Sequence, residues 1–140
     1  MDYLIEQGIK VDAIITDPPY AVTSYSWDQI IPFDQMWDKL SKLIKDDGAI
    51  VLFGNEPFSS SLRMSNPKFY RYDWKWIKTQ VTGFQNAKYQ PLRCYEDIMI
   101  FSKCGAVASA KPPMRYFPQG IIPVNLKVTT KPINYLGDKK

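Results

Sequence analysis

Two apolar runs and one amphipathic stretch dominate the first third of the chain. Residues 11–15 form a compact apolar run of the size expected for a strand buried on both faces of a sheet. Residues 33–44 carry apolar side chains at helical spacing, with Pro32 suited to the first turn and Gly48 expected to end the helix. Residues 49–54 form a second buried run. This order predicts a strand–helix–strand unit with parallel strands and a right-handed crossover.

Three weaker elements follow. Asn55 is expected to cap a short helix that begins at Glu56. Residues 70–79 and 95–103 are interpreted as a third and a fourth strand. The polar, basic and turn-rich segment 80–94 between them predicts a long loop. The pattern as a whole therefore predicts an α/β fold.

The chain divides into two regions at Gly105. Residues 1–105 contain all the predicted elements, and 140 residues suffice for one domain with a core. Residues 106–140 hold five of the eleven prolines and show no helical pattern. We expect an irregular basic tail there, which is either an extension or the start of a further region.

Charge is distributed unevenly between the two parts of the chain. Residues 1–62 carry four Lys or Arg against ten Asp or Glu, a net charge of −6, whereas residues 63–140 carry fourteen against four, a net charge of +10. The basic part is interleaved with Tyr, Trp and Phe, which favours a polyanionic partner, with nucleic acid first. A solvated basic surface without a partner explains the charge equally well.

Several classes of protein fit the sequence poorly. No apolar run approaches the length of a membrane span, and the N-terminus lacks a signal-peptide pattern, so we expect no membrane and a cytoplasmic protein. The chain has no histidine, so Cys94 and Cys104 cannot form a common zinc site, and no metal is expected. Free thiols are the better interpretation.

The residues Asp17, Pro18, Pro19 and Tyr20 follow the first strand directly, and ligands of open parallel sheets bind beyond the carboxyl ends of the strands. Two successive prolines make a stiff loop. The Asp17 carboxylate and the Pro18 carbonyl offer two acceptors, and the Tyr20 ring offers a face for stacking. This set matches the exocyclic amino group of a heterocycle such as adenine. The nitrogen of that group is a poor nucleophile because its lone pair is delocalised into the ring, so it must be held by hydrogen bonds that orient the lone pair toward an electrophile. Such a base would have to be extruded from a duplex.

An ordinary strand-ending turn with an exposed tyrosine is the competing interpretation of these four residues. The context favours a site, because the motif ends a predicted buried strand and precedes a second strand and a basic aromatic region. A ligand of WW domains is a poor fit, since that motif places one residue between the second proline and the tyrosine.

With these residues the chain resembles the amino-methylating DNA methyltransferases, of the adenine-N6 group whose catalytic motif precedes the methyl-donor motif. The resemblance rests on four stretches in the family's order, over roughly residues 4–103: VDAIITDPPY, KLIKDDGAIVLFGNEPF, YDWKWIKT and NAKYQPLRCYEDIMIFSK. It implies a partial Rossmann-like methyltransferase sheet, S-adenosylmethionine as methyl donor and DNA as partner. Residues 1–105 would be the catalytic-loop half of the domain, and residues 106–140 the start of a target-recognition region.

The resemblance also implies roles for the four motif residues. Asp17 and the Pro18 carbonyl would hold the target amino group, Pro19 would stiffen the loop, and Tyr20 would stack on the flipped base. Asp17 would also stand at the shared edge of the donor site. Aspartate at this position resembles the adenine enzymes, whereas enzymes that methylate cytosine N4 more often carry serine.

Four further residues match the family's pattern without a clear role. Glu96 and Lys103 lie on a strand that lines the target pocket in the family, although ordinary strand-edge charges explain them equally well. Trp74 and Trp76 are expected to pack in the core and the sheet rather than to stack on bases.

The chain departs from the family in its glycines. Family members have a glycine-rich donor loop, but no two of the seven glycines here are separated by a single residue. The long helix that usually precedes that loop is missing too. We therefore expect a substrate-side half, truncated or split before its donor half, with self-association or a complementary chain as one way to supply the rest.

Three functions compete at this stage. The first is a site-specific DNA methyltransferase that acts on adenine N6, with an N4-cytosine enzyme as its variant. The second is a non-catalytic DNA-binding remnant, whose binding would be sensitive to salt and would survive Asp17→Ala. The third is a methyltransferase for RNA or a protein amide, which is less favoured because those relatives commonly carry asparagine in place of Asp17.

Overall fold

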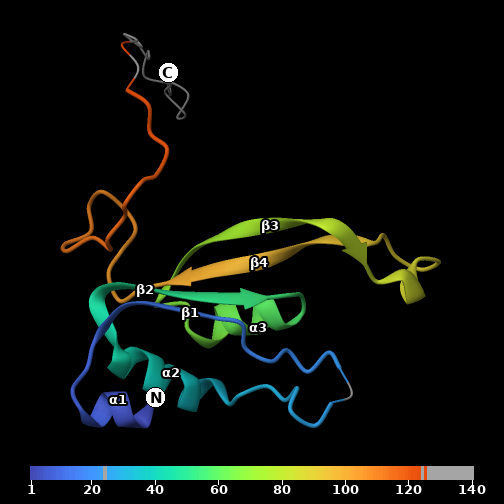
Figure 1. The fold of residues 1–140 in the computed structure, drawn as a ribbon, viewed down its shortest axis with the longest axis horizontal. Helices are drawn as coiled ribbons and strands as arrows, with labels where there is room; N and C mark the ends of the chain where they lie inside the picture. Colours follow the sequence, from blue (N-terminus) through green and yellow to red (C-terminus); the bar gives the residue numbers. More distant parts are fainter. Residues whose placement is uncertain (24, 124, 126–140) are drawn as a thin grey trace, which may run out of the picture.

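The computed structural model describes residues 1–23, 25–123 and 125, and Figure 1 shows their arrangement. One sheet of four strands forms the centre, in the order β1–β2–β4–β3. The strands are β1 (Val11–Thr16), β2 (Ile44–Gly54), β3 (Tyr70–Thr82) and β4 (Arg93–Phe101). The helices are α1 (Asp2–Glu6), α2 (Phe33–Leu43), α3 (Phe58–Ser65) and the short 3₁₀ helix η1 (Phe84–Asn86). This arrangement confirms the predicted α/β fold.

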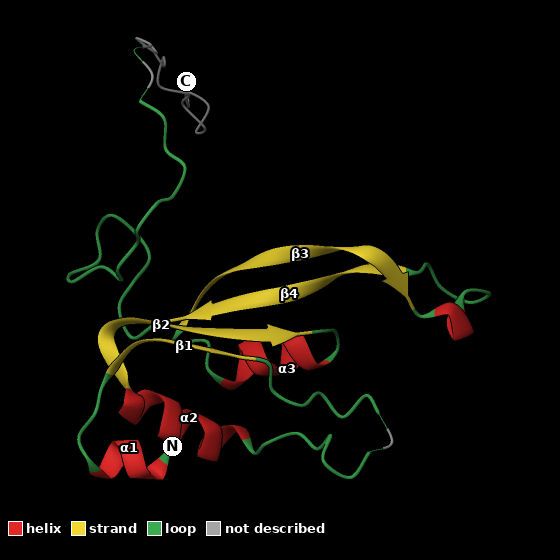
Figure 2. Ribbon diagram, viewed as in Figure 1, coloured by secondary structure: helices red, strands yellow, loops and turns green. Residues whose placement is uncertain are grey.

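The predicted strand–helix–strand unit is present, with β1 parallel to β2. Ile14 pairs with Ile50 in the regular part of this ladder. The prediction that β1 is buried on both faces is wrong, because Ile15 is 68% exposed. The strand lies at one edge of the sheet, and the α-helices cover only one face of that sheet (Figure 2). Side chains of β1 that alternate onto the opposite face therefore meet solvent.

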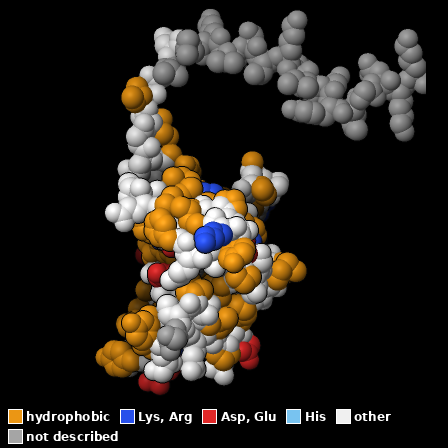
Figure 3. Space-filling model, turned by 90° about the vertical axis from the view of Figure 1, so that its right-hand side faces the viewer, with side chains coloured by type: hydrophobic (Ala, Val, Ile, Leu, Met, Phe, Trp, Pro, Cys, Tyr) orange, Lys and Arg blue, Asp and Glu red, His pale blue; other side chains and the backbone are white. Residues whose placement is uncertain are grey.

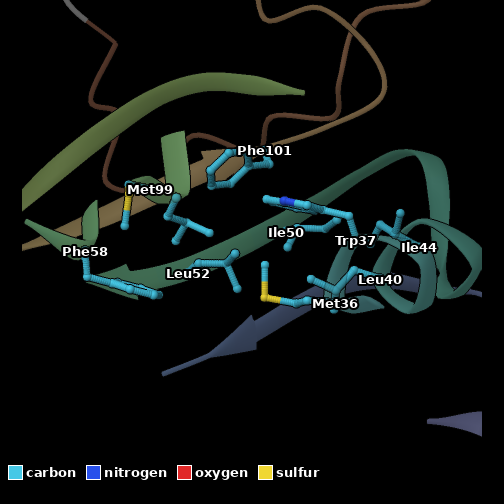
Figure 4. Close-up of a cluster of buried hydrophobic side chains, with 10 residues drawn as sticks. Met36, Trp37, Leu40, Ile44, Ile50, Leu52, Phe58, Met99 and Phe101 are labelled. Carbon is cyan, nitrogen blue, oxygen red and sulfur yellow. The ribbon is translucent and has the colours of Figure 1, made fainter. Parts of the chain in front are cut away.

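The core lies between the helix-covered face of the sheet and the helices α2 and α3 (Figure 4). Because side chains alternate along a strand, Ile50 and Leu52 of β2 point to the same face, and both are fully buried. Apolar positions one helical turn apart on α2 and α3 pack against them. The buried cluster comprises Met36, Trp37, Leu40, Ile44, Ile50, Leu52, Phe58, Leu62, Met99 and Phe101.

Helix α2 ends earlier than its apolar pattern predicts. Its last residue is Leu43, and Ile44 already has extended backbone and pairs with Val11 of β1. Gly48 therefore does not end the helix but lies within β2, so that prediction is wrong. The apolar Ile44 would be buried both as the last residue of a helix and as the first residue of a strand, so its hydrophobicity does not decide between them. The contact with the sheet decides where the helix ends.

Gly48 is required by the close approach of β1 to β2. A Cβ atom at this position would lie 2.7 Å from the Asp12 carbonyl oxygen and 2.8 Å from a methyl carbon of Ile44. The hydroxyl of the buried Ser102 donates a hydrogen bond of 2.8 Å to the Gly48 carbonyl oxygen, which further limits movement.

We expect Gly48→Ala to lower the free energy of unfolding by about 1–3 kcal/mol, because the added methyl group must displace backbone. Urea denaturation followed by circular dichroism measures this loss. Gln7→Ala, an exposed substitution, is the control and should leave the midpoint unchanged. A Gly48→Ala variant as stable as the original chain would contradict the close approach.

The start of α3 differs from the prediction in one detail. The helix begins at Phe58, and its N-cap position, Pro57, makes no side-chain capping hydrogen bond. Asn55 is therefore not the side-chain cap, and only its backbone carbonyl accepts a hydrogen bond, from the Ser59 N–H at 3.0 Å. The Glu56 carboxylate accepts from the Ser60 N–H at 3.1 Å instead, since a longer side chain reaches further into the first turn.

Strands β3 and β4 form an antiparallel hairpin, which confirms both predicted strands. Strand β3 continues three residues further than predicted, to Thr82, so the connecting loop is shorter than expected. The prediction that Trp74 and Trp76 pack in the core is wrong, because they are 54% and 49% exposed. They alternate onto the uncovered sheet face, where Trp76 contacts Phe53 with ring centroids 6.1 Å apart.

The described part of the tail is irregular, as predicted. The Arg115 N–H donates to the Asp47 carbonyl oxygen at 3.1 Å and its guanidinium bonds the same residue's carboxylate at 2.5 Å, which ties the tail to β2. A pocket of about 520 Å³ separates the tail from β3 and is lined by Tyr72, Trp74, Gly105, Ala106, Val107, Ala108, Pro113, Met114 and Tyr116. The rest of the predicted tail region, residues 124 and 126–140, lies outside the described residues. No helix in the described segments has the length and apolar character needed to cross a bilayer.

Candidate functional site

The loop Asp17–Tyr20 begins where β1 ends, at Thr16. It therefore lies at the carboxyl edge of the parallel pair β1–β2, as the sequence predicts. Pro18 is buried, whereas Asp17 is exposed and Tyr20 is partly buried. The prolines thus anchor the loop against the protein while the two groups capable of hydrogen bonding remain accessible. Figure 1 shows the loop after β1 on the same side of the molecule as the tip of the β3–β4 hairpin.

Tyr20 and Asp17 contact each other directly. The Tyr20 hydroxyl donates a hydrogen bond to Oδ1 of Asp17, and within the described residues Oδ2 accepts no hydrogen bond. The Tyr20 ring packs on Phe58 of α3, with centroids 5.0 Å apart and an interplanar angle of 31°. Burial, and then the hydrogen bond with Asp17, raise the pKa of the Tyr20 hydroxyl above its usual range. Tyr20 is therefore a neutral donor that fixes the orientation of the Asp17 carboxylate.

The loop forms part of the wall of a pocket of about 370 Å³. Residues from the next segment complete the wall, so one stretch of chain after β1 encloses the pocket. Trp27, which is 69% exposed, is one of them, and its ring stacks on Tyr25 with centroids 5.7 Å apart. The pocket thus offers a carboxylate, aromatic rings and apolar walls. Its lining consists of Asp17, Pro18, Pro19, Tyr20, Val22, Thr23, Trp27 and Asp28.

The pocket contains residues that sequence reasoning missed, chiefly Trp27 and Asp28. Asp28 is only 6% exposed and accepts hydrogen bonds from the N–H groups of Ala21, Val22 and Thr23. No sequence signal could have identified it, because a single aspartate in a polar loop is typical of any exposed turn. The packing of Phe58 on Tyr20 was missed as well, because the two residues are distant in the sequence.

The structure separates Glu96 and Lys103, the two residues of the fourth predicted strand that match the family's pattern. Glu96 lies next to Asp97, which pairs with Gly54 at the carboxyl end of β2, so Glu96 is at the site edge of the sheet. It forms an ion pair with Lys78 of β3. Lys103 follows the other end of β4 and bonds Asp46 at 2.9 Å, at the opposite edge of the sheet. Only Glu96 therefore lies near the candidate site.

A cluster of charged residues centred on the buried Asp97 lies at this edge. Asp97 is 1% exposed, and its carboxylate bonds Arg63 of α3 at 2.9 Å and also Lys75 of β3. Arg63 extends the cluster to Glu56 at 2.9 Å and to Asp73 at 3.3 Å. Burial acts to raise the pKa of Asp97, but the hydrogen bonds from Lys75 and Arg63 outweigh it and lower the pKa below its ordinary value. The cluster connects α3 with the hairpin.

Half of the ten described Lys and Arg residues in the second part of the chain form such ion pairs. Salt bridges in the described structure involve Arg63, Lys75, Lys78, Lys103 and Arg115. Figure 3 views the molecule from the side at which the candidate site lies and shows mainly hydrophobic and neutral side chains there, with few acidic ones. On this side of the described structure, the charge asymmetry of the sequence does not form a continuous basic face.

Groups of three or more residues able to hold a metal ion do not occur in the described part of the chain. Cys94 and Cys104 are free thiols, and Cys104 is buried.

The comparisons with known proteins point to a fold. Neither the models of known protein families nor the curated proteins match this chain. Among solved structures, it is similar to the crystal structures of M1.HpyAVI and of the M1.HpyAVI–SAM complex, with TM-scores of 0.54 and 0.53 and 21% sequence identity in both. The aligned region covers 73% of this chain and 50% of that chain. The chain thus has the fold of about half of M1.HpyAVI.

Proposed function

We propose that this chain is the acceptor-side part of a DNA methyltransferase that uses S-adenosylmethionine and modifies the N6 amino group of an extruded adenine. The observation that carries the proposal is the Asp17–Tyr20 loop at the carboxyl end of β1, where it lines a pocket of about 370 Å³. The fold similarity to a protein solved in complex with SAM supports it. The ordered motifs around Asp17 support the choice of adenine.

The residues of the loop account for the activation of a poor nucleophile. Oδ2 of Asp17 and the Pro18 carbonyl would accept the two amino hydrogens, which favours a tetrahedral nitrogen with its lone pair directed outward. Tyr20 would hold the carboxylate through its hydroxyl and present its ring edge or free face to the base. On transfer of the methyl group, the donor's carbon–sulfur bond would break with its electron pair kept by sulfur, and Asp17 or water would accept the one proton that the nitrogen releases.

The methyl donor supplies an electrophilic methyl group on a positively charged sulfur. The exposed Asp17 carboxylate at the pocket rim suits a cationic donor, and it is the one residue to which we assign contact with both substrates. We assign the other contacts with the methyl donor to residues other than the described ones. These residues belong either to a longer form of this chain or to a complementary chain. The open edge of β1 is where added strands would pair. We further propose that residues 106–140 belong to a target-recognition region.

Product analysis tests the proposed reaction. Duplex DNA of mixed sequence is incubated with methyl-labelled S-adenosylmethionine and the chain, together with the protein that completes its donor site, and is then digested to nucleosides and analysed by mass spectrometry. The expected product is N6-methyladenine. N4-methylcytosine would instead assign the cytosine reaction, and label in RNA or protein would assign the third class of substrate.

A non-catalytic role in DNA binding is the second candidate, favoured by the exposed rings of Trp74 and Trp76, on which bases can stack. Exposed aromatic and basic side chains bind single-stranded nucleic acid without chemistry. This candidate predicts salt-dependent binding with no labelled nucleoside in the same assay.

A further inference from the structure

The segment that follows the Asp17–Tyr20 loop is held by a single carboxylate. Oδ1 of Asp28 accepts from the Ala21 N–H at 2.9 Å, and Oδ2 accepts from the Val22 and Thr23 N–H groups at 2.9 and 2.6 Å. The Thr23 hydroxyl adds a fourth hydrogen bond at 2.7 Å. Both oxygens are thus used, and the charge is balanced by backbone dipoles, because Asp28 forms no salt bridge within the described residues.

The held backbone is strained. Ala21 has φ of +56°, a left-handed conformation that costs a non-glycine residue about 1–2 kcal/mol. Three consecutive N–H groups converge on one point only because the chain turns back in this way. Strain of this kind persists where the surroundings impose it, and here the imposing group is Asp28.

The four hydrogen bonds to Asp28 form a clamp that connects the two ends of the pocket wall. Ala21 follows Tyr20 directly, and Asp28 follows Trp27, so the four hydrogen bonds fix the start and the end of the segment that carries Val22 and Thr23. Without them, the wall opposite Asp17 and Tyr20 would depend on exposed loop contacts alone.

We propose that Asp28 is a positioning residue of the acceptor pocket: it holds residues 21–23 and thereby sets the spacing between the Tyr20 and Trp27 walls that receive the base. This inference rests on the proposed function, but its geometric part is independent of it. Hydrogen bonds to the carboxylate lower the pKa of Asp28, the one from the Thr23 side chain foremost, so the clamp is intact at neutral pH. Its titratable neighbours in the pocket are Asp17 and Tyr20.

The first test is nuclear magnetic resonance of the wild-type chain and of Asp28→Asn. Asparagine has the same size but keeps one acceptor and turns an NH₂ group toward the backbone donors. We expect the amide protons of residues 21–23 to resonate downfield in the wild type and to move together upfield in the variant. On acidification of the wild type, the three signals should follow one midpoint below 3.8, the ordinary value for aspartate. Asp34→Asn, an exposed aspartate of α2, is the matched control.

The second test is functional and uses deoxyadenosine as the probe. We expect Asp28→Asn to weaken deoxyadenosine binding by about tenfold and to lower kcat for methyl transfer by a similar factor, with KM for DNA changed less than about twofold. Thr23→Val removes only the hydroxyl and should cause a loss of about two- to threefold, which keeps the inference testable if Asp28→Asn fails to fold.

The outcomes separate this inference from the proposed function. If Asp17→Ala abolishes binding while Asp28→Asn and Thr23→Val behave like Asp34→Asn, the positioning role is overturned and the proposed function stands. If the wild-type chain does not bind deoxyadenosine, the proposed function falls and the positioning role falls with it. Amide signals that do not respond to Asp28→Asn overturn the clamp itself.

Discussion

Asp17→Ala is expected to lower kcat for methyl transfer to adenine by about 10²- to 10³-fold, the range seen when one preorganised hydrogen-bonding group of a reacting centre is removed. Alanine deletes one of the two acceptors for the amino hydrogens and leaves the Tyr20 hydroxyl without its partner. The KM for DNA should change little, because contacts with the phosphate backbone supply most of the affinity. Single-turnover kinetics with labelled S-adenosylmethionine measures the effect.

Two control variants separate the role of Asp17 from that of its surroundings. Tyr20→Phe removes the hydroxyl that holds Asp17 but keeps the ring on Phe58, so it should cost far less than Asp17→Ala. Asp34→Ala, on the exposed surface of α2, should have no effect. Methylation that persists at the wild-type rate in Asp17→Ala would exclude this loop as the acceptor site.

Asp97→Asn is expected to lower the free energy of unfolding by about 2–4 kcal/mol, because it leaves Arg63 and Lys75 without their buried partner. The loss is smaller than for a fully isolated charge, since Arg63 keeps Glu56 and Asp73. Urea denaturation at pH 7 measures it. Asp46→Asn breaks a pair in which the aspartate side chain is 85% exposed, and its midpoint should not move measurably.

The same pair of proteins tests the pH dependence. The pKa of Asp97 is lower in the folded chain than its ordinary value of 3.8, so its contribution is complete above about pH 5 and is lost as the pH falls through the folded-state pKa. The stability difference between wild type and Asp97→Asn should therefore be constant near neutral pH and shrink below 3.8. A difference that grows on acidification would show that the carboxylate is not stabilised by its partners.

Part of the fold and of the site could be predicted because it depends on local pattern. The continuous apolar run in residues 49–54, the helical spacing from Phe33 to Leu43 and the prolines after β1 each act within a few residues. The position of Asp17 and Tyr20 at the end of a parallel strand follows from these elements alone, because a strand–helix–strand unit places that end at a ligand-binding edge.

Several predictions that depended on partners distant in the sequence were wrong, and the position of Lys103 was left open. Ile44 belongs to the sheet rather than to α2 because Val11 pairs with it. Trp74 and Trp76 lie exposed because the α-helices cover only the other face of the sheet. Lys103 lies away from the site because β4 runs antiparallel to β2. In each case the residue's own neighbours in the chain are compatible with either outcome.

The sequence by itself determined the type and order of the four strands and of α2 and α3, and the motif that ends β1, since periodicity and turn chemistry are properties of short segments. Only the tertiary structure decided the strand order β1–β2–β4–β3, the packing of Tyr20 on Phe58 and the clamp of Asp28 on residues 21–23. Those features depend on which apolar surfaces of distant segments pack together when the whole chain folds. They also depend on the path of a loop whose polar residues specify no single conformation.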